Sequence, residues 1–175
     1  MTDAAALLDE LQRPWRHGEH FDGRGLVLND PLVLDGMDIR GFDFSEAEFR
    51  AGFSAKGTRF RGLVWMRGAQ IDGMCDLGRS SSRTDVRADG LRAGSVNLAG
   101  CQLQGVLSFA GARLSGLSLH GALVMANVTL EGAVIDGAVD LAEAELMGGL
   151  WTANAQIGAL NRDSAQISGR VRLPS

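Results

Sequence analysis

Apolar and polar residues alternate along most of the chain, in a pattern that repeats about every eleven residues from Leu26 onward. The template is AxLxGxVxLxG, and copies begin at Ala112, Ala122 and Ala133. A repeat this short is typical of a solenoid, in which each unit stacks on the next. The pattern therefore indicates the architecture before any other signal is considered.

The repeat divides residues 26–175 into 14 blocks of ten or eleven residues, with apolar side chains mostly at positions 1, 3, 7 and 9. Alternation with period 2 indicates extended chain, whose side chains point alternately inward and outward. Each block splits into two such pieces, with Gly at the joints and an extra residue at position 6 that the ten-residue blocks lack. We predict a coil of four short sides, two blocks per turn, stacked about seven times.

The only helical pattern lies in residues 3–12. Asp3 is a suitable N-cap, and Pro14 ends the segment. The apolar stripe consists of Leu7, Leu8 and Leu11. We predict a short N-terminal α-helix that covers the apolar end of the solenoid, because repeat proteins need capped ends. Residues 1–25 would then form the helix and a connecting segment, and residues 26–175 the β-helix.

Pentapeptide pairs such as AELMG from Ala144 and AQISG from Ala165 resemble the A(D/N)LXX motif of the pentapeptide-repeat family. The resemblance covers residues 26–175, and it implies an all-β fold, a right-handed quadrilateral β-helix with Ala and Leu inward. The chain departs from the motif in two ways. Asp or Asn seldom follows the small residue, and 5+6 spacing is more frequent than 5+5. The fold expectation survives both departures, but no particular subfamily is indicated.

The repeat breaks at residues 80–94. With blocks that begin at Ser80 and Gly90, the side chains of Ser82, Asp85, Arg87 and Arg92 would point inward, and buried unpaired charges are too costly. We therefore predict a bulge or protruding loop, which is either a tolerated irregularity or a functional loop that presents Arg83, Arg87 and Arg92. A second break, Arg162 at an inward position, predicts a local distortion.

The last block ends with Val171 and Leu173 at inward positions. The final coil would leave open strand edges and an apolar cross-section, which favour association. We hypothesise a homodimer through the C-terminal coil. Dimerisation through the last coil is also common in the family that the chain resembles.

Charged residues are distributed unevenly along the chain. The net charge of the 175 residues is −4, but residues 1–49 hold eleven acidic and four basic residues, and residues 50–92 hold four acidic and nine basic ones. On a rod, such segments predict alternating charged bands along the axis. The basic segment covers only two or three coils, so it is too short for the continuous basic stripe of a nucleic-acid-binding protein.

Candidate catalytic chemistry is sparse. His17 and His20 form HxxH without a third ligand nearby, so we predict no metal site. Cys75 and Cys101 occupy inward positions and are interpreted as small buried apolar residues. No nucleotide-binding or nucleophile motif occurs, so we expect neither a cofactor nor an enzyme. The acidic N-terminus and the short apolar runs lead us to expect a cytoplasmic protein without membrane insertion.

Two tryptophans occupy outward position 8, in the fourth and twelfth blocks. Two blocks per coil would place Trp65 and Trp151 on one face, four coils or roughly 19 Å apart. Ser108 and Thr129 would lie between them, so the middle of this face is predicted to be largely uncharged. Exposed Trp is enriched at interfaces, although each ring could also simply cover a neighbouring corner.

These observations predict a non-enzymatic protein–protein interaction scaffold that presents flat solenoid faces. The predicted contacts are Trp65, Trp151, Arg83, Arg87 and Arg92. The family resemblance implies an alternative, a DNA mimic that binds DNA gyrase and protects or inhibits it. A mimic should be acidic along most of its length, whereas here the middle of the chain is basic.

Overall fold

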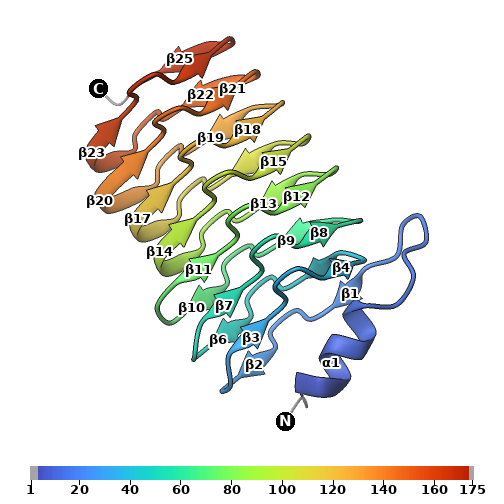
Figure 1. The fold of residues 1–175 in the computed structure, drawn as a ribbon. Helices are drawn as coiled ribbons and strands as arrows, with labels where there is room; N and C mark the ends of the chain where they lie inside the picture. The colour runs from blue at the N-terminus through green and yellow to red at the C-terminus, as the bar shows by residue number, and fades with distance from the viewer. Residues whose placement is uncertain (1–3, 174–175) are drawn as a thin grey trace.

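The computed structural model describes residues 4–173, as one helix and 25 short strands. The strands stack along one axis, with α1 (Ala4–Leu11) at one end and β25 (Arg170–Arg172) at the other (Figure 1). The strand pairings of the described residues are parallel, and paired residues lie 21 or 22 positions apart, as in Phe21↔Phe42 and Phe42↔Val64. Each coil therefore consists of two repeat blocks, which confirms the predicted solenoid of about seven coils.

The strands of the described residues form three sheets, here named A, B and C. Sheet A contains β1 (Phe21–Asp22), β5 (Phe42–Asp43), β9 (Val64–Trp65), β13 (Val86–Arg87), β16 (Leu107–Ser108), β19 (Val128–Thr129), β22 (Gly149–Trp151) and β25. Sheet C contains β4 (Asp38–Ile39), β8 (Arg59–Phe60), β12 (Ser81–Ser82), β15 (Gln102–Leu103), β18 (Leu123–Val124), β21 (Glu145–Leu146) and β24 (Gln166–Ile167).

Sheet B supplies the other two sides of each coil. In the first three coils these sides are separate strands: β2 (Val27–Leu28), β6 (Glu48–Phe49) and β10 (Gln70–Ile71) on one side, β3 (Leu32–Val33), β7 (Phe53–Ser54) and β11 (Cys75–Asp76) on the other. In the later coils one long strand spans both sides: β14 (Arg92–Asn97), β17 (Arg113–Ser118), β20 (Val134–Asp140) and β23 (Gln156–Asn161).

Block length accounts for most of this difference. The blocks of β14 (counted from Leu91), β17 and β23 have ten residues and lack the extra residue at the corner, so the strand continues through it. The block of β20 has eleven residues, and the register shifts opposite Leu114–Leu117 and again at Ile135–Ala138. β20 therefore absorbs the extra residue as a β-bulge.

The interior follows the predicted inward positions. Ala133, Ile135, Val139 and Leu141 are all buried, and the same positions of the other blocks form one continuous core. Aromatic rings fill the first coils, where Phe42 stacks on Phe44 with a centroid distance of 4.3 Å. Each buried large side chain contributes on the order of 1.5–3 kcal/mol. Stability thus accumulates along the whole stack.

Helix α1 covers the N-terminal end of the core, as predicted. Leu7 and Leu11 are fully buried, and the Leu11 carbonyl accepts a hydrogen bond from the Arg40 amide at 3.1 Å. The Arg40 guanidinium contacts Glu10 at 3.3 Å, which adds an ion pair between the helix and the first coil. The predicted N-cap, Asp3, lies outside the described residues.

The predicted start of the β-helix at residue 26 is wrong. Strand β1 pairs with β5 in register, so the solenoid begins at Phe21, inside the segment interpreted as a connection. The Phe21 ring packs edge-on against Phe44, with a centroid distance of 5.9 Å. The first block is truncated to a single side, which is why the two-piece template missed it.

The predicted bulge at residues 80–94 is also wrong. Strands β12, β13 and β14 pair with both neighbouring coils. Leu91, and not Gly90, occupies the small inward position, so Val86 and Leu91 are buried while Arg87 and Arg92 point outward. Ser82 does point inward, and its hydroxyl donates a 3.0 Å hydrogen bond to the Thr84 carbonyl.

Arg162 requires no distortion. It occupies the inward row on the last described coil, one coil beyond the buried Leu141, and it is exposed. Because no further coil covers it within residues 4–173, its guanidinium stays in contact with solvent. The predicted cost of a buried charge therefore does not arise at this position.

Candidate interaction surfaces

Trp65 and Trp151 lie on sheet A, at the same outward strand position. The register runs from Trp65 through Arg87, Ser108 and Thr129 to Trp151, one residue per coil. Four coil steps of about 4.8 Å separate the two rings by about 19 Å. Both side chains are partly buried. The structure thus places the pair on one face, four coils apart, as predicted.

Each tryptophan is accompanied by an arginine. The Arg67 guanidinium carbon lies 4.4 Å from the centroid of the Trp65 ring, and that of Arg172 lies 5.8 Å from the Trp151 ring. Both distances allow a cation–π attraction. Sequence reasoning missed these partners, although Arg67 follows Trp65 by two residues and Arg172 follows Trp151 by one coil. The Trp151 Nε1 atom is buried and donates no hydrogen bond within residues 4–173.

The middle of this face holds one charged residue, Arg87, that the sequence did not predict there. Arg87 lies next to Trp65 in the row, because the block boundary at residue 91 turns its side chain outward. Its guanidinium contacts the Asp85 carboxylate at 2.8 Å. Ser108 is buried and its hydroxyl donates a hydrogen bond to Asp89. The face therefore combines two tryptophans with a neutralised arginine and short polar side chains.

The five residues predicted to bind a partner do not form one site. Trp65, Arg87 and Trp151 share sheet A. Arg83 directly follows strand β12 of sheet C, and Arg92 begins β14 in sheet B. Arg83 and Arg92 are exposed and make no ion pair within the described residues. The absence of a bulge explains the separation, because the solenoid sides point in different directions.

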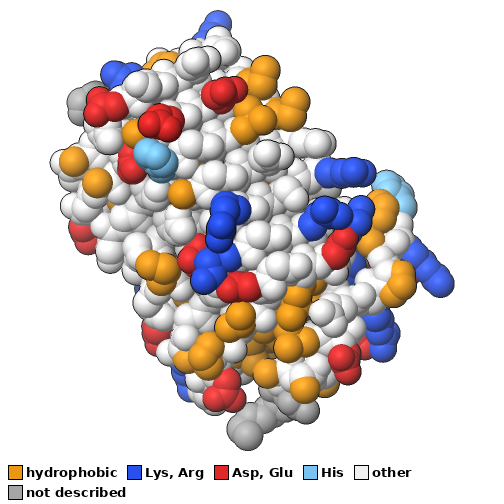
Figure 2. Space-filling view, in the orientation of Figure 1, with side chains coloured by type: hydrophobic (Ala, Val, Ile, Leu, Met, Phe, Trp, Pro, Cys, Tyr) orange, Lys and Arg blue, Asp and Glu red, His pale blue; other side chains and the backbone are white. Residues whose placement is uncertain are grey.

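Ion pairs between adjacent coils neutralise much of the charge in the acidic and basic bands predicted for the N-terminal half. Asp38 accepts a 2.7 Å hydrogen bond from Arg61 and lies 3.5 Å from Arg59, one coil away. The Arg61 hydrogen bond holds the pKa of Asp38 below its usual range. Asp35 and Lys56 form a similar inter-coil pair at 3.4 Å. Figure 2 shows basic and acidic side chains interspersed on one face of the molecule.

A less neutralised acidic belt surrounds one coil near the C-terminal end. It consists of Glu131, Asp136, Asp140, Glu143 and Glu145. Among the described residues, His120 lies against this belt, with its Nδ1 3.5 Å from the Asp140 carboxylate, and it forms an ion pair only when the imidazole is protonated. The belt occupies a single coil, so its extent along the axis is about 5 Å.

The last described coil exposes apolar side chains that earlier coils bury. Val171 and Leu173 are 40% and 45% exposed. Leu150, which pairs with Val171 one coil earlier, is fully buried. Ile157 and Ile167 are likewise only partly buried. The outward edges of β23, β24 and β25 have no strand partner among residues 4–173.

Reactive chemistry is scarce in the described residues. No cluster of three or more His, Cys, Asp or Glu side chains is arranged to hold a metal ion within residues 4–173. Cys75 and Cys101 are free and buried, and burial raises the pKa of both thiols to about 12. No helix between residues 4 and 173 is long and apolar enough to cross a membrane.

Comparison with known proteins adds little to this geometry. No protein-family model matches the chain, and no curated protein matches it in sequence. Among solved structures, it is similar to HetL, a pentapeptide repeat protein involved in heterocyst differentiation regulation from the cyanobacterium Nostoc sp. strain PCC 7120. The identity is 16% and the TM-score 0.26, with 95% of each chain covered. The strand pairings themselves show a parallel β-solenoid of about seven coils with one short N-terminal helix, and the resemblance to the pentapeptide-repeat family is carried by the sequence motif.

Proposed function

We propose that this protein is a non-enzymatic interaction scaffold that binds a protein partner across sheet A. The observation that supports this function is the placement of Trp65 and Trp151 on one face, four coils apart, each with an arginine against its ring. Tryptophan and arginine are the side chains most often responsible for interface affinity. Two such anchors on a rigid stack would fix the partner's position along the axis.

The test is affinity capture from native lysate with mass spectrometry, using the wild-type chain and the double variant Trp65→Ala/Trp151→Ala. Met74→Ala is the matched control, because Met74 is a large exposed apolar side chain that lies in the turn between β10 and β11 of sheet B and not on sheet A. We expect a partner that the double variant loses and the control keeps. A partner that the double variant retains would contradict the assignment to sheet A.

The DNA-mimic alternative has weaker support. A mimic of duplex DNA requires acidic charge along most of the rod, whereas the inter-coil ion pairs neutralise the first coils and the acidic belt occupies one coil. A gyrase supercoiling assay separates the two functions. Inhibition or protection by the wild-type chain, lost when Asp136 and Asp140 are replaced by Asn, would favour the mimic over the scaffold.

We also propose that the protein forms a homodimer through its last coil. The partly exposed Val171 and Leu173, together with the unpaired strand edges beside them, offer apolar surface to a second copy. Light scattering at micromolar concentration should then give the mass of a dimer, and Val171→Lys/Leu173→Lys should give a monomer. Val33→Lys, at an exposed Val of sheet B, is the control that should remain dimeric. A monomeric wild-type chain would refute the proposal.

A further inference from the structure

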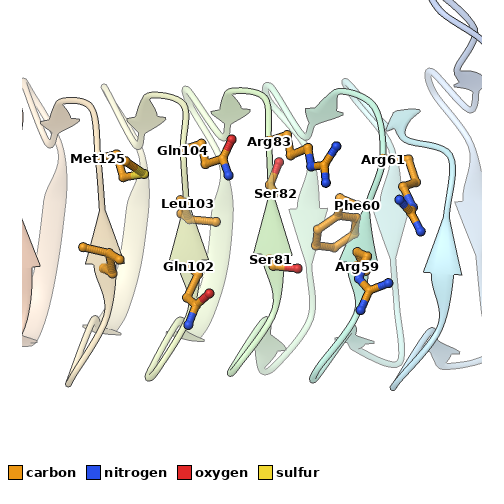
Figure 3. A pocket seen from close by; sticks show the side chains of 11 residues that line it. Arg59, Phe60, Arg61, Ser81, Ser82, Arg83, Gln102, Leu103, Gln104 and Met125 are labelled. Carbon is orange, nitrogen blue, oxygen red and sulfur yellow. The ribbon is translucent and has the colours of Figure 1, made fainter.

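A groove crosses sheet C, on a different side of the solenoid from the tryptophan pair. Its volume is about 400 Å³, and strands β8, β12, β15 and β18 provide its lining. Two outward rows border it. One row runs Arg59, Ser81, Gln102 along the axis. The other is the residue after each strand: Arg61, Arg83, Gln104. Figure 3 shows both rows.

Short side chains at β12 create the hollow. Ser81 lies between the long side chains of Arg59 and Gln102 in the row, and Ser82 replaces a large apolar residue in the inward row between Phe60 and Leu103. The surface therefore sinks at this rung while its neighbours stand out (Figure 3). The depression is built by the sequence of one strand and is backed on both sides by paired coils.

The end of the groove toward the N-terminus is cationic. Arg59, Arg61 and Arg83 line it, and no carboxylate does. Arg59 and Arg61 share a single counter-ion, Asp38. Arg83 makes no ion pair or hydrogen bond within residues 4–173, and it is exposed. Three guanidinium groups at this end therefore face one neighbouring carboxylate, that of Asp38, which leaves two positive charges in excess.

The opposite end is neutral and then apolar. Gln102 and Gln104 follow the arginines, and their exposed amides can donate or accept hydrogen bonds. Leu123 and Met125 line the far end, where Met125 is 50% exposed. In Figure 3 the arginines and Met125 lie at opposite ends of the view. A ligand that fills the groove must therefore change from anionic to apolar along its length.

We propose that this groove binds an extended peptide segment with adjacent acidic residues at one end and an apolar residue at the other. Three rung spacings of about 4.8 Å span about 14 Å, which matches about four residues of extended chain. The carboxylates would lie against Arg83 and Arg59, where charge-assisted hydrogen bonds are the strongest available. The apolar side chain would pack on Leu123 and Met125. A uniformly charged polyanion would leave this apolar half unused.

Fluorescence anisotropy with short labelled peptides tests the proposal. The probes are Gly-Glu-Glu-Ser-Leu-Gly and its reverse, Gly-Leu-Ser-Glu-Glu-Gly, each compared with a version in which both Glu are Gln. The variants are Arg83→Gln, which removes the unpaired charge, and Ser81→Gln, which fills the hollow without changing the charge. Arg113→Gln and Ser115→Gln are the matched controls, because both residues are exposed on sheet B.

We expect saturable binding of one acidic peptide, weakened about tenfold by Arg83→Gln and by Ser81→Gln, and unchanged in both controls. The Gln peptides should not bind. Equal losses in the controls, equal binding of the Gln peptides, or no saturable binding would overturn the proposal. So would tighter binding of a single-stranded oligonucleotide with the same variant dependence. Trp65→Ala/Trp151→Ala should leave peptide binding intact, so the experiment can refute the groove proposal without refuting the sheet A interface, and the reverse.

Discussion

Replacing Gly137 by Ala tests whether the coils stack as closely as the structure requires. Gly137 lies in β20, between β17 and β23, and a Cβ atom there would stand 2.4 Å from the Ser115 carbonyl oxygen of the preceding coil. Its backbone does not have a positive φ. At such a position, Gly→Ala ordinarily stabilises a protein by about 0.4–1 kcal/mol, because the unfolded chain loses entropy.

The close approach of the Ser115 carbonyl oxygen makes the same substitution destabilising at Gly137. The contact involves backbone on both sides, and the coil beyond Gly137 prevents β20 from moving away. Overpacking of this kind costs about 1–3 kcal/mol or more. We therefore expect Gly137→Ala to lower the free energy of unfolding by about 2 kcal/mol.

Gly121→Asn is the matched control, because Gly121 has a φ of +62° but no atom lies within 4 Å of the place that a Cβ would take. Glu143 occupies the same corner one coil later with a φ of 58°, so a side chain is tolerated there. We expect this variant to change stability by less than about 1 kcal/mol. Urea unfolding followed by circular dichroism measures both variants. An unchanged or stabilised Gly137→Ala protein, or a larger loss for Gly121→Asn, would refute the close stacking.

Burial and charge lead to three further predictions. Leu11→Ala should lower the unfolding free energy in urea by about 2–5 kcal/mol, because it opens a cavity under the cap; a loss below about 0.5 kcal/mol would contradict the capping role. Asp38→Asn should lower the melting temperature at pH 7, and the difference from the wild type should shrink as pH falls below 3.8, the ordinary pKa of Asp: the Arg61 bond lowers the folded pKa of Asp38, so its stabilisation is present above the unfolded pKa and is lost as pH falls through the folded pKa. A difference that does not change with pH would contradict this. Cys75 and Cys101 should react with a thiol reagent only after unfolding, because both thiols are buried and protonated; rapid labelling of the native protein would disprove it.

The break in the repeat at residues 80–94 shows how a small error in the template changes the predicted faces of the strands. At residues 80–94 the template was one residue out of register, and this alone turned Arg87 and Arg92 inward in the prediction. A one-residue slip exchanges the faces of a strand. The apolar Val86 and Leu91 carried the correct register, but choosing them required knowing that the block ends at Gly90, where the chain turns with a φ of +69°.

Side-chain placement along a solenoid follows from period and coil length, so the alignment of Trp65 with Trp151 could be predicted. The excess of cations in the groove could not. It depends on which carboxylates reach across to the next coil, and Asp38 reaches Arg61 although 23 residues separate them. The hollow at Ser81 was equally hidden, because its depth is set by the neighbours above and below and not by those in sequence.

The repeating inward positions, the solenoid and the cap can be read from the chain alone, because they follow from local alternation of apolar and polar residues. The three-dimensional stack is needed to tell which sides merge into one sheet, where the first coil begins, which charges are neutralised and where the surface sinks. These properties arise between residues one coil apart. Stacking places side chains 21 or 22 residues apart at about 4.8 Å, and a single slipped residue changes every such neighbour.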